Sequence, residues 1–230
     1  NNMFARCYNL RTPPSILRPT TASNYCYSSM FLECRSLQTA PKIMLTTGSD
    51  YAFSNMFRNC VSLKKAPMIN RLASGSFGSV FQNFFYGCTA LEEAPPELVI
   101  NKLHSRSFEQ AFYGCIALKK LPDITILNGL YAESQTYGFN YAFAYCTSVE
   151  QPPKINYTGK LPGYCFNFAF YYCTSLKKTP ALPWDTFTSS ANTNVYASAF
   201  AYCFSLEEAP EEFYIAESVG RHLDGCRIGF

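Results

Sequence analysis

Charge is scarce in this sequence, and so are long hydrophobic runs. Of its 230 residues 15% are charged, and the formal net charge is only +3. A nucleic-acid-binding protein normally carries a clustered basic face, so we expect no nucleic acid among the partners. No apolar run approaches the roughly 20 residues of a membrane-spanning helix. We therefore expect no membrane insertion within this chain.

Residues that carry catalysis or bind metals are equally few. There are two histidines, His104 and His222, and neither lies in a recognisable constellation. The eleven cysteines have no repeated histidine beside them that could act as an oriented base. No Cys-x-x-Cys pair is present for a structural zinc site, and the four aspartates lack calcium-loop spacing. We expect no enzymatic activity, no metal and no cofactor.

What the sequence does contain is one twelve-residue motif in eight copies. Each copy has Phe, then Cys three residues on, an aliphatic residue, nearly always Leu, six on, and Pro ten on. The repeated phenylalanines are Phe4, Phe31, Phe57, Phe85, Phe112, Phe143, Phe170 and Phe200. Their mean spacing of about 28 residues lies in the solenoid range. A unit this short cannot bury its own apolar face, so it must stack on its neighbours.

This period defines the domain organisation. No long linker interrupts it, so we expect residues 1–230 to form a single solenoid, with 211–230 as a degenerate last repeat or a C-terminal cap. The first residues already fit a repeat, with no signal peptide or polar cap before them. We therefore interpret the chain as part of a longer protein. Exposed apolar ends of a solenoid also lead us to expect end-to-end self-association.

Eight of the cysteines hold one position in the repeat. Stacked coils would place them in a column with roughly 5 Å between neighbours, whereas a disulfide needs Cβ atoms about 3.5–4.5 Å apart and suitably directed. We therefore interpret them as small buried core residues. Cys26, Cys165 and Cys226 lie outside this register, and the sequence leaves their redox state open.

Each repeat predicts one short helix and one short strand. Tyr27, Met30, Phe31 and Cys34 have the i, i+3, i+4, i+7 spacing of an apolar helix stripe, which predicts about two helical turns. The following Leu-x-x-Ala-Pro segment predicts an extended strand that ends at or near the Pro. Successive strands would be parallel. The expected fold class is an α/β leucine-rich-repeat solenoid of about eight coils, with a parallel sheet on one face and short helices on the other.

The two residues after the repeat Leu alternate in charge from the third repeat onward. They are Lys64-Lys65, Glu92-Glu93, Lys119-Lys120, Glu150-Gln151, Lys177-Lys178 and Glu207-Glu208. Side chains at equivalent positions of neighbouring coils lie side by side, and each opposite-charge pair contributes about 0.2–1 kcal/mol. This pattern predicts a ladder that controls register. It also leaves the sheet face neutral, which argues further against phosphate binding.

The repeats resemble the BspA-like leucine-rich repeats of bacterial cell-surface proteins, of the kind found in Bacteroides. The likeness is carried by blocks such as Ala111-Phe-Tyr-Gly-Cys-Ile-Ala-Leu118 and Cys26-Tyr-Ser-Ser-Met-Phe31. It implies a right-handed solenoid with a parallel sheet on one side. It also implies a cell-surface or secreted protein that adheres to protein or glycan ligands on host or neighbouring cells.

Two features are candidates for ligand binding. Tyr145, Tyr172 and Tyr202 lie two residues past the repeat Phe in three consecutive coils. Such a row could bind a partner, since tyrosine is enriched at interfaces, or the rings could simply stack on one another and shield the coils. Trp184, the only tryptophan, lies in a long return segment and could pack against the solenoid or face a ligand.

The most probable function from sequence is therefore a non-enzymatic cell-surface interaction module that binds through an extended face. The alternative is a structural spacer that presents another domain of a longer surface protein. The sequence does not name the ligand.

Overall fold

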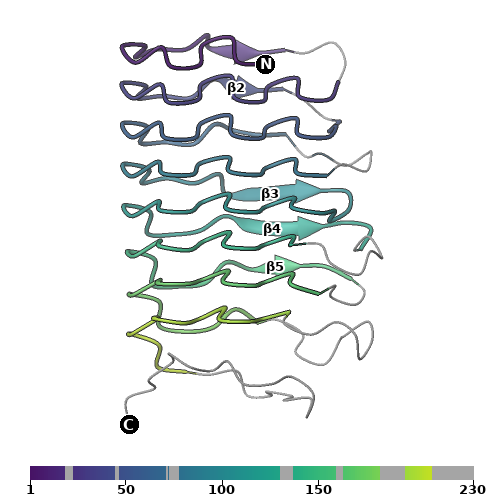
Figure 1. Ribbon diagram of the computed structural model, residues 1–230, viewed down its shortest axis with the longest axis vertical. Coiled ribbons are helices and arrows are strands. Elements are labelled where there is room, and N and C mark those ends of the chain that lie inside the picture. Colours follow the sequence, from purple (N-terminus) through teal and green to yellow (C-terminus); the bar gives the residue numbers. More distant parts are fainter. Residues whose placement is uncertain are drawn as a thin grey trace.

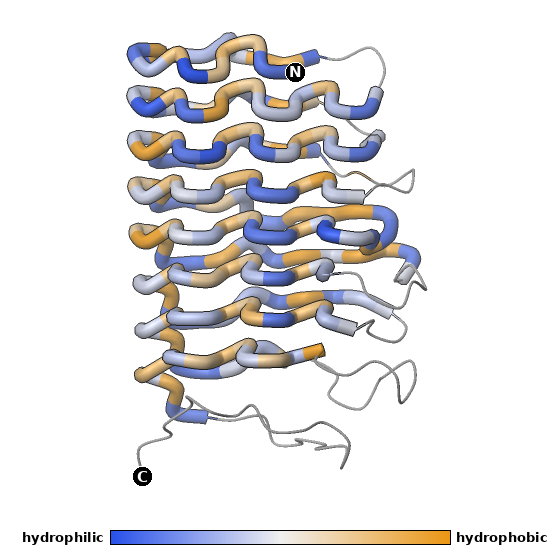
Figure 2. The backbone as a smooth tube through the Cα atoms, in the orientation of Figure 1, coloured by the Kyte–Doolittle hydropathy of each residue, from blue (hydrophilic) through white to orange (hydrophobic). Residues whose placement is uncertain are grey.

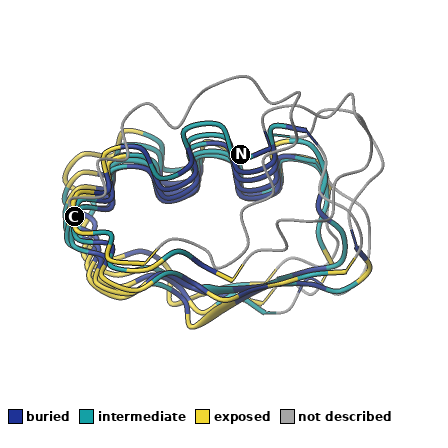
Figure 3. Ribbon diagram, turned by 90° about the horizontal axis from the view of Figure 1, so that it is seen from below, coloured by how far each residue is buried: buried dark blue, intermediate teal, exposed yellow. Residues whose placement is uncertain are grey.

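The structure is a computed structural model that describes residues 1–18, 23–44, 47–70, 72, 78–129, 137–158, 163–181 and 195–208. Its coils stack in sequence order along one axis (Figure 1). In the view along this axis, equivalent segments of successive coils superpose, and each coil is a flattened ring with one scalloped side and one smoother side (Figure 3). The predicted solenoid is confirmed for the described residues.

The smoother side carries short parallel strands. They are β1 (Ile16–Leu17), β2 (Lys42–Ile43), β3 (Glu97–Ile100), β4 (Asp123–Ile126) and β5 (Ile155–Asn156). One sheet has the order β1-β2 and the other β3-β4-β5, and all pairs are parallel, as predicted. An isolated bridge between Ile43 and Ile69 carries the β2 register on to the next coil.

The predicted position of the strands was wrong: they follow the prolines instead of ending at them. Proline has no amide hydrogen to donate to a ladder, so continuous pairing starts only beyond it. Leu98, Ile124 and Ile155 occupy equivalent places in β3, β4 and β5 and are buried. The segment before the proline contributes only single bridges, such as that between Lys65 and Glu93.

The scalloped side was expected to contain helices, and the described residues contain none. It is a ribbon of successive turns in which alternate amides have different partners. Ala52 N donates to Ser49 O (3.1 Å) within the coil, whereas Phe53 N donates to Val80 O (3.0 Å) in the next coil. Met56 N and Phe57 N repeat the two patterns four residues later. Half of the amides therefore tie each coil to the following one, as in a parallel ladder.

The turn ribbon has a four-residue repeat, which explains why the helix prediction failed. Every fourth residue has a positive φ, for example Tyr51 (56°), Asn55 (56°) and Asn59 (59°). An i, i+3, i+4, i+7 stripe fits a period of 4.0 as well as the 3.6 of a helix over so few residues. The apolar positions were identified correctly, and all of them point inward, but the backbone that presents them is different.

The core consists of aligned aromatic and aliphatic columns, and hydrophobic residues recur at equivalent places along the stack (Figure 2). One aromatic column is the repeated Phe, with ring centroids 5.5 Å apart between Phe31 and Phe57 and 5.0 Å apart between Phe143 and Phe170. A second column runs four residues upstream, where Phe108 and Phe139 stack at 5.0 Å with an interplanar angle of 2°. The in-register stacking inferred from the motif is confirmed.

The repeated cysteines from Cys34 to Cys203 form the predicted buried column, whereas Cys7 in the first coil is exposed because no coil of the described residues precedes it; the ten cysteines of the described residues are free thiols. Each thiol from Cys34 onward donates to the carbonyl oxygen of the repeat Phe in the preceding coil. Cys60 Sγ lies 3.0 Å from Phe31 O, and Cys146 Sγ lies 3.1 Å from Phe112 O. Burial raises the pKa of Cys34 to about 11 and that of Cys146 to about 12. The column is therefore protonated at neutral pH and serves packing and coil alignment.

Candidate interaction site

The predicted tyrosine row exists and lies at one turn of the scalloped side. Tyr145 and Tyr172 stack with centroids 5.3 Å apart, and Tyr172 and Tyr202 lie 5.4 Å apart at an angle of 37°. Tyr172 is 36% exposed and Tyr202 is 39% exposed. The rings therefore stack on one another and also reach solvent. Whether they bind a ligand stays a prediction.

The row belongs to a larger aromatic surface, which we call the turn-face aromatic patch. It consists of Tyr113, Tyr141, Tyr145, Phe168, Tyr171, Tyr172, Tyr202 and Phe204. Tyr141 stacks on Phe168 at 4.6 Å, and Tyr171 meets the edges of Tyr145 and Tyr202 at 5.6 and 5.2 Å. Phe204 continues the surface beyond Tyr202 and is 62% exposed.

Sequence reasoning found three members of this patch and missed the others. Relative to the repeat Phe, Tyr141 is two residues before, Tyr171 is one after and Phe204 is four after. No single column of the repeat contains them, and only the stacking of coils brings them together. A count of aromatics per repeat over all outward positions would have indicated the enrichment of the later coils.

Tyrosines of the patch present edges and hydroxyl groups more than open ring faces. Tyr145 and Tyr172 stack at 5.3 Å, and Tyr171 makes edge-to-face contacts with its neighbours; both geometries are favourable and cover part of each ring face. Burial, with the neighbouring tyrosine Tyr145, raises the pKa of Tyr113 to about 12, and the same causes raise the pKa of Tyr141. These hydroxyls are therefore protonated and able to donate hydrogen bonds at neutral pH.

The backbone beneath the patch does not require aromatic side chains. Tyr145, Tyr172 and Tyr202 have φ of 60°, 60° and 63°. Asn59 and Gly87 stand at the equivalent position of earlier coils with φ of 59° and 69°. A left-handed conformation costs a residue with a side chain about 1–2 kcal/mol, less for Asn and nothing for Gly. The tyrosines therefore occupy positions where the fold favours other residues.

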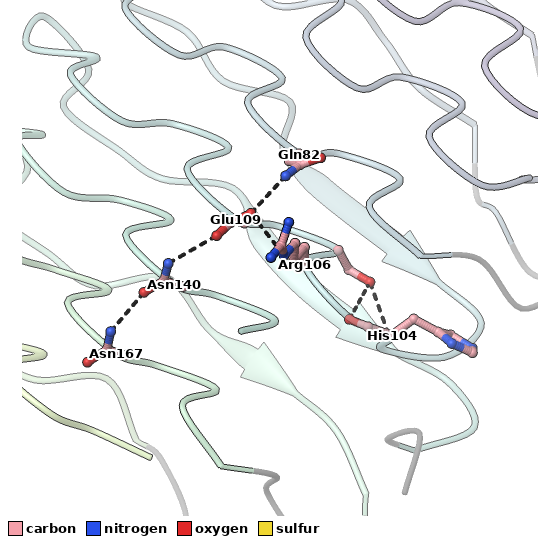
Figure 4. Close-up of polar contacts among 7 residues, drawn as sticks. Gln82, His104, Arg106, Glu109, Asn140 and Asn167 are labelled. Carbon is pink, nitrogen blue, oxygen red and sulfur yellow. Dashed lines mark hydrogen bonds and ion pairs between the residues drawn. The ribbon is translucent and has the colours of Figure 1, made fainter. Parts of the chain in front are cut away.

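A ladder of polar side chains crosses successive coils (Figure 4). Gln82 Nε2 donates to Glu109 Oε2 (2.8 Å), and Asn140 Nδ2 donates to Glu109 Oε1 (3.1 Å). Asn167 Nδ2 continues the ladder to Asn140 Oδ1 (2.9 Å), and Arg106 lies 3.7 Å from the Glu109 carboxylate. Gln82, Glu109, Asn140 and Asn167 each lie three residues before a repeat Phe. The recurrence of polar residues at that position is the sequence signal that indicates the ladder.

The other features considered as candidate sites lie outside the described residues or are not found within them. Trp184, the fourth predicted ligand-binding residue, lies outside them, as do Cys226 and residues 211–230. The described part holds no group of three His, Cys, Asp or Glu side chains that could bind a metal ion. It also holds no helix long and apolar enough to cross a membrane.

Comparisons with known proteins give two structural similarities. One is to a leucine-rich repeat protein from Bacteroides ovatus ATCC 8483, with 20% identity and a TM-score of 0.45 over 91% of this chain. The other is to a leucine rich cell surface protein from Faecalibacterium prausnitzii A2-165, with 15% identity and a TM-score of 0.22, covering 78% of this chain and 74% of that one.

This chain spans 48% of the length of the Bacteroides ovatus protein. No protein-family model matches the sequence, and no curated protein matches it either. The assignment of the fold therefore rests on the stacked coils and the parallel strands described above.

Proposed function

We propose that this chain is a non-enzymatic interaction module of the cell surface, and that it binds its ligand through the turn-face aromatic patch. The observation that carries the proposal is that coils with the same backbone conformation carry different side chains at the same position. The Asn59 position accepts a small polar side chain, yet three later coils carry tyrosine there, exposed at Tyr172 and Tyr202 and half-buried at Tyr145. Exposed tyrosines that the fold does not need are typical of binding hot spots.

The geometry favours a protein ligand over a glycan. A sugar ring that packs on an aromatic side chain needs an open ring face, and the faces of Tyr145 and Tyr172 are stacked on each other at 5.3 Å, while Tyr202 lies tilted against Tyr172 at 5.4 Å. Edges and hydroxyl groups remain, and these suit the carbonyl and side-chain acceptors of a protein surface. The exposed Phe204 adds an apolar contact at the margin of the patch.

The test is binding by a variant that removes the rings and keeps the backbone. Tyr145→Asn, Tyr172→Asn and Tyr202→Asn are combined, because Asn59 shows that Asn suits this position. Wild type and variant are assayed by pull-down against extracellular matrix proteins and on a glycan array. We expect wild type to bind a matrix protein at micromolar concentration and the variant to lose at least about tenfold in affinity, as expected for hot-spot residues.

A matched control removes a different tyrosine stack. Tyr25 and Tyr51 stack at 4.7 Å in the earlier coils, and Ser79 occupies the equivalent position with φ of 53°. Tyr25→Ser with Tyr51→Ser should therefore leave binding unchanged. Absence of any wild-type binding would favour the structural spacer, and full binding by the triple variant would move the site to another face.

A further inference from the structure

We propose that the strand side of the solenoid binds a second copy of this chain in antiparallel orientation, through its rows of alternating charge. The rows, numbered one to six, are Lys64/Lys65, Glu92/Glu93, Lys119/Lys120, Glu150/Gln151, Lys177/Lys178 and Glu207/Glu208. Eleven of these twelve side chains are exposed and Lys177 is half-exposed. This inference is independent of the aromatic patch, because no residue of the patch belongs to the rows.

The rows are held in register by the backbone, so the charges form true stripes. Lys65 is bridged to Glu93, Lys120 to Gln151, and Lys178 to Glu208, each in parallel. Ion pairs then cross neighbouring coils: Lys65 to Glu93 at 2.5 Å, Lys177 to Glu150 at 2.8 Å and Lys178 to Glu208 at 2.9 Å. The predicted ladder is confirmed at these junctions.

Six alternating stripes are complementary to themselves under one two-fold rotation. An axis parallel to the strands brings row one against row six, row two against row five and row three against row four. Because odd rows are positive and even rows negative, every stripe then meets an opposite one. Lys64 faces Glu207 of the second copy, for example. Such an isologous contact closes after two subunits, as in most homodimers.

The parallel face-to-face arrangement is opposed by the same stripes. A two-fold axis along the solenoid places each row against itself, so that Lys rows meet Lys rows and Glu rows meet Glu rows. Outside the stripes, the antiparallel arrangement also places Asp123 opposite Lys154, because they follow the prolines of the coils carrying rows three and four. A second copy also shares the coil spacing, so the match persists over all six rows.

The expected contact is weak and depends on salt. Exposed ion pairs contribute little each, and lysine and glutamate are depleted from the cores of stable interfaces. Complementary stripes mainly fix orientation and speed encounter. We therefore expect dimers at low ionic strength, where the Debye length is about 30 Å at 0.01 M, and monomers near 1 M, where it is about 3 Å.

The experiment uses sedimentation velocity and zero-length carbodiimide cross-linking of the whole chain. A half-reversed variant inverts rows one to three by Lys64→Glu, Lys65→Glu, Glu92→Lys, Glu93→Lys, Lys119→Glu and Lys120→Glu. It disrupts one junction within the chain, between rows three and four, and makes all antiparallel contacts like-charged. A control variant, Lys119→Glu with Lys120→Glu and Glu150→Lys, disrupts two internal junctions but leaves the contacts between copies complementary.

We expect wild type and control to dimerise at low salt, with Lys64–Glu207 cross-links, and the half-reversed variant to stay monomeric. Lys64 and Glu207 are five coils apart, about 25 Å at strand spacing, so that cross-link forms only between copies. A folded half-reversed chain, checked by circular dichroism, ensures that loss of dimer is not loss of fold. Monomeric wild type at low salt, or equal dimerisation of the half-reversed variant, would overturn the proposal.

Discussion

The earlier and later coils of the scalloped side share a backbone but not a surface. In the earlier coils charged groups lie among the tyrosines: Arg6 lies 3.7 Å from Glu33, and Arg58 lies over the ring of Tyr86 at 4.6 Å. In the later coils the same side carries the turn-face aromatic patch. Because φ at the equivalent positions stays between 57° and 71° from Glu33 to Gly114 and Tyr145, the backbone does not account for the difference in side chains.

The interior shows no such difference between the two halves, and core truncation should break both equally. Phe57 and Phe143 are fully buried and each stacks between two neighbouring rings. We expect Phe57→Ala and Phe143→Ala each to lower the free energy of unfolding by about 3–5 kcal/mol, measured by urea denaturation. A loss below about 1 kcal/mol in one half only would show that its coils are not stacked as described.

The thiol column extends through both halves and should make stability fall at alkaline pH. Burial raises the pKa of Cys34 to about 11 and that of Cys146 to about 12, from an ordinary value of 9.0. The unfolded thiols ionise first, so the stabilisation is complete below pH 9 and is lost as the pH rises towards 12. Urea midpoints measured across this range should fall. In a Cys34→Ala/Cys146→Ala variant the fall should be shallower, and an unchanged slope would contradict the assignment.

Glu109 lies between the two halves and should have an intermediate effect. Its carboxylate accepts hydrogen bonds from Gln82 and Asn140, which belong to the coils on either side. Glu109→Gln replaces one acceptor oxygen with a donor that meets another donor, so we expect a loss of about 1–3 kcal/mol. Thermal unfolding gives the measurement. Asn167→Ala, at the end of the ladder, should lose less, and the reverse order would argue against a continuous network.

The smallest effect is expected from exchanging the turn residues themselves. Tyr172→Asn loses ring stacking of about 0.5–1.5 kcal/mol. It also removes the conformational cost of a tyrosine with a left-handed backbone, which is of comparable size. Asn59→Tyr makes the opposite change in an earlier coil. Both should leave the free energy of unfolding within about 1 kcal/mol of wild type. A large loss from Tyr172→Asn would mean that the patch serves the fold and not a ligand.

The sequence predicted what depends on repetition. The period, the single thiol column, the parallel strands and the charge ladder all follow from identical residues meeting in successive coils. Backbone conformation was harder to predict, because Tyr27, Met30, Phe31 and Cys34 satisfy a four-residue turn repeat as well as a helix. The strands were displaced because pairing resumes only after the proline at each repeat. Tyr141 and Phe204 of the patch were missed because they come from different positions of the repeat.

Native-state thiol labelling read by mass spectrometry tests the stacked-coil account most directly. Iodoacetamide at pH 8 should modify the exposed Cys7 rapidly and Cys26, which is half-buried, more slowly. The thiols of Cys34, Cys60, Cys88, Cys115, Cys146, Cys165, Cys173 and Cys203 should stay unmodified until the chain is unfolded. Rapid labelling of the column in the native protein, or disulfide-linked peptides between its members, would contradict the account.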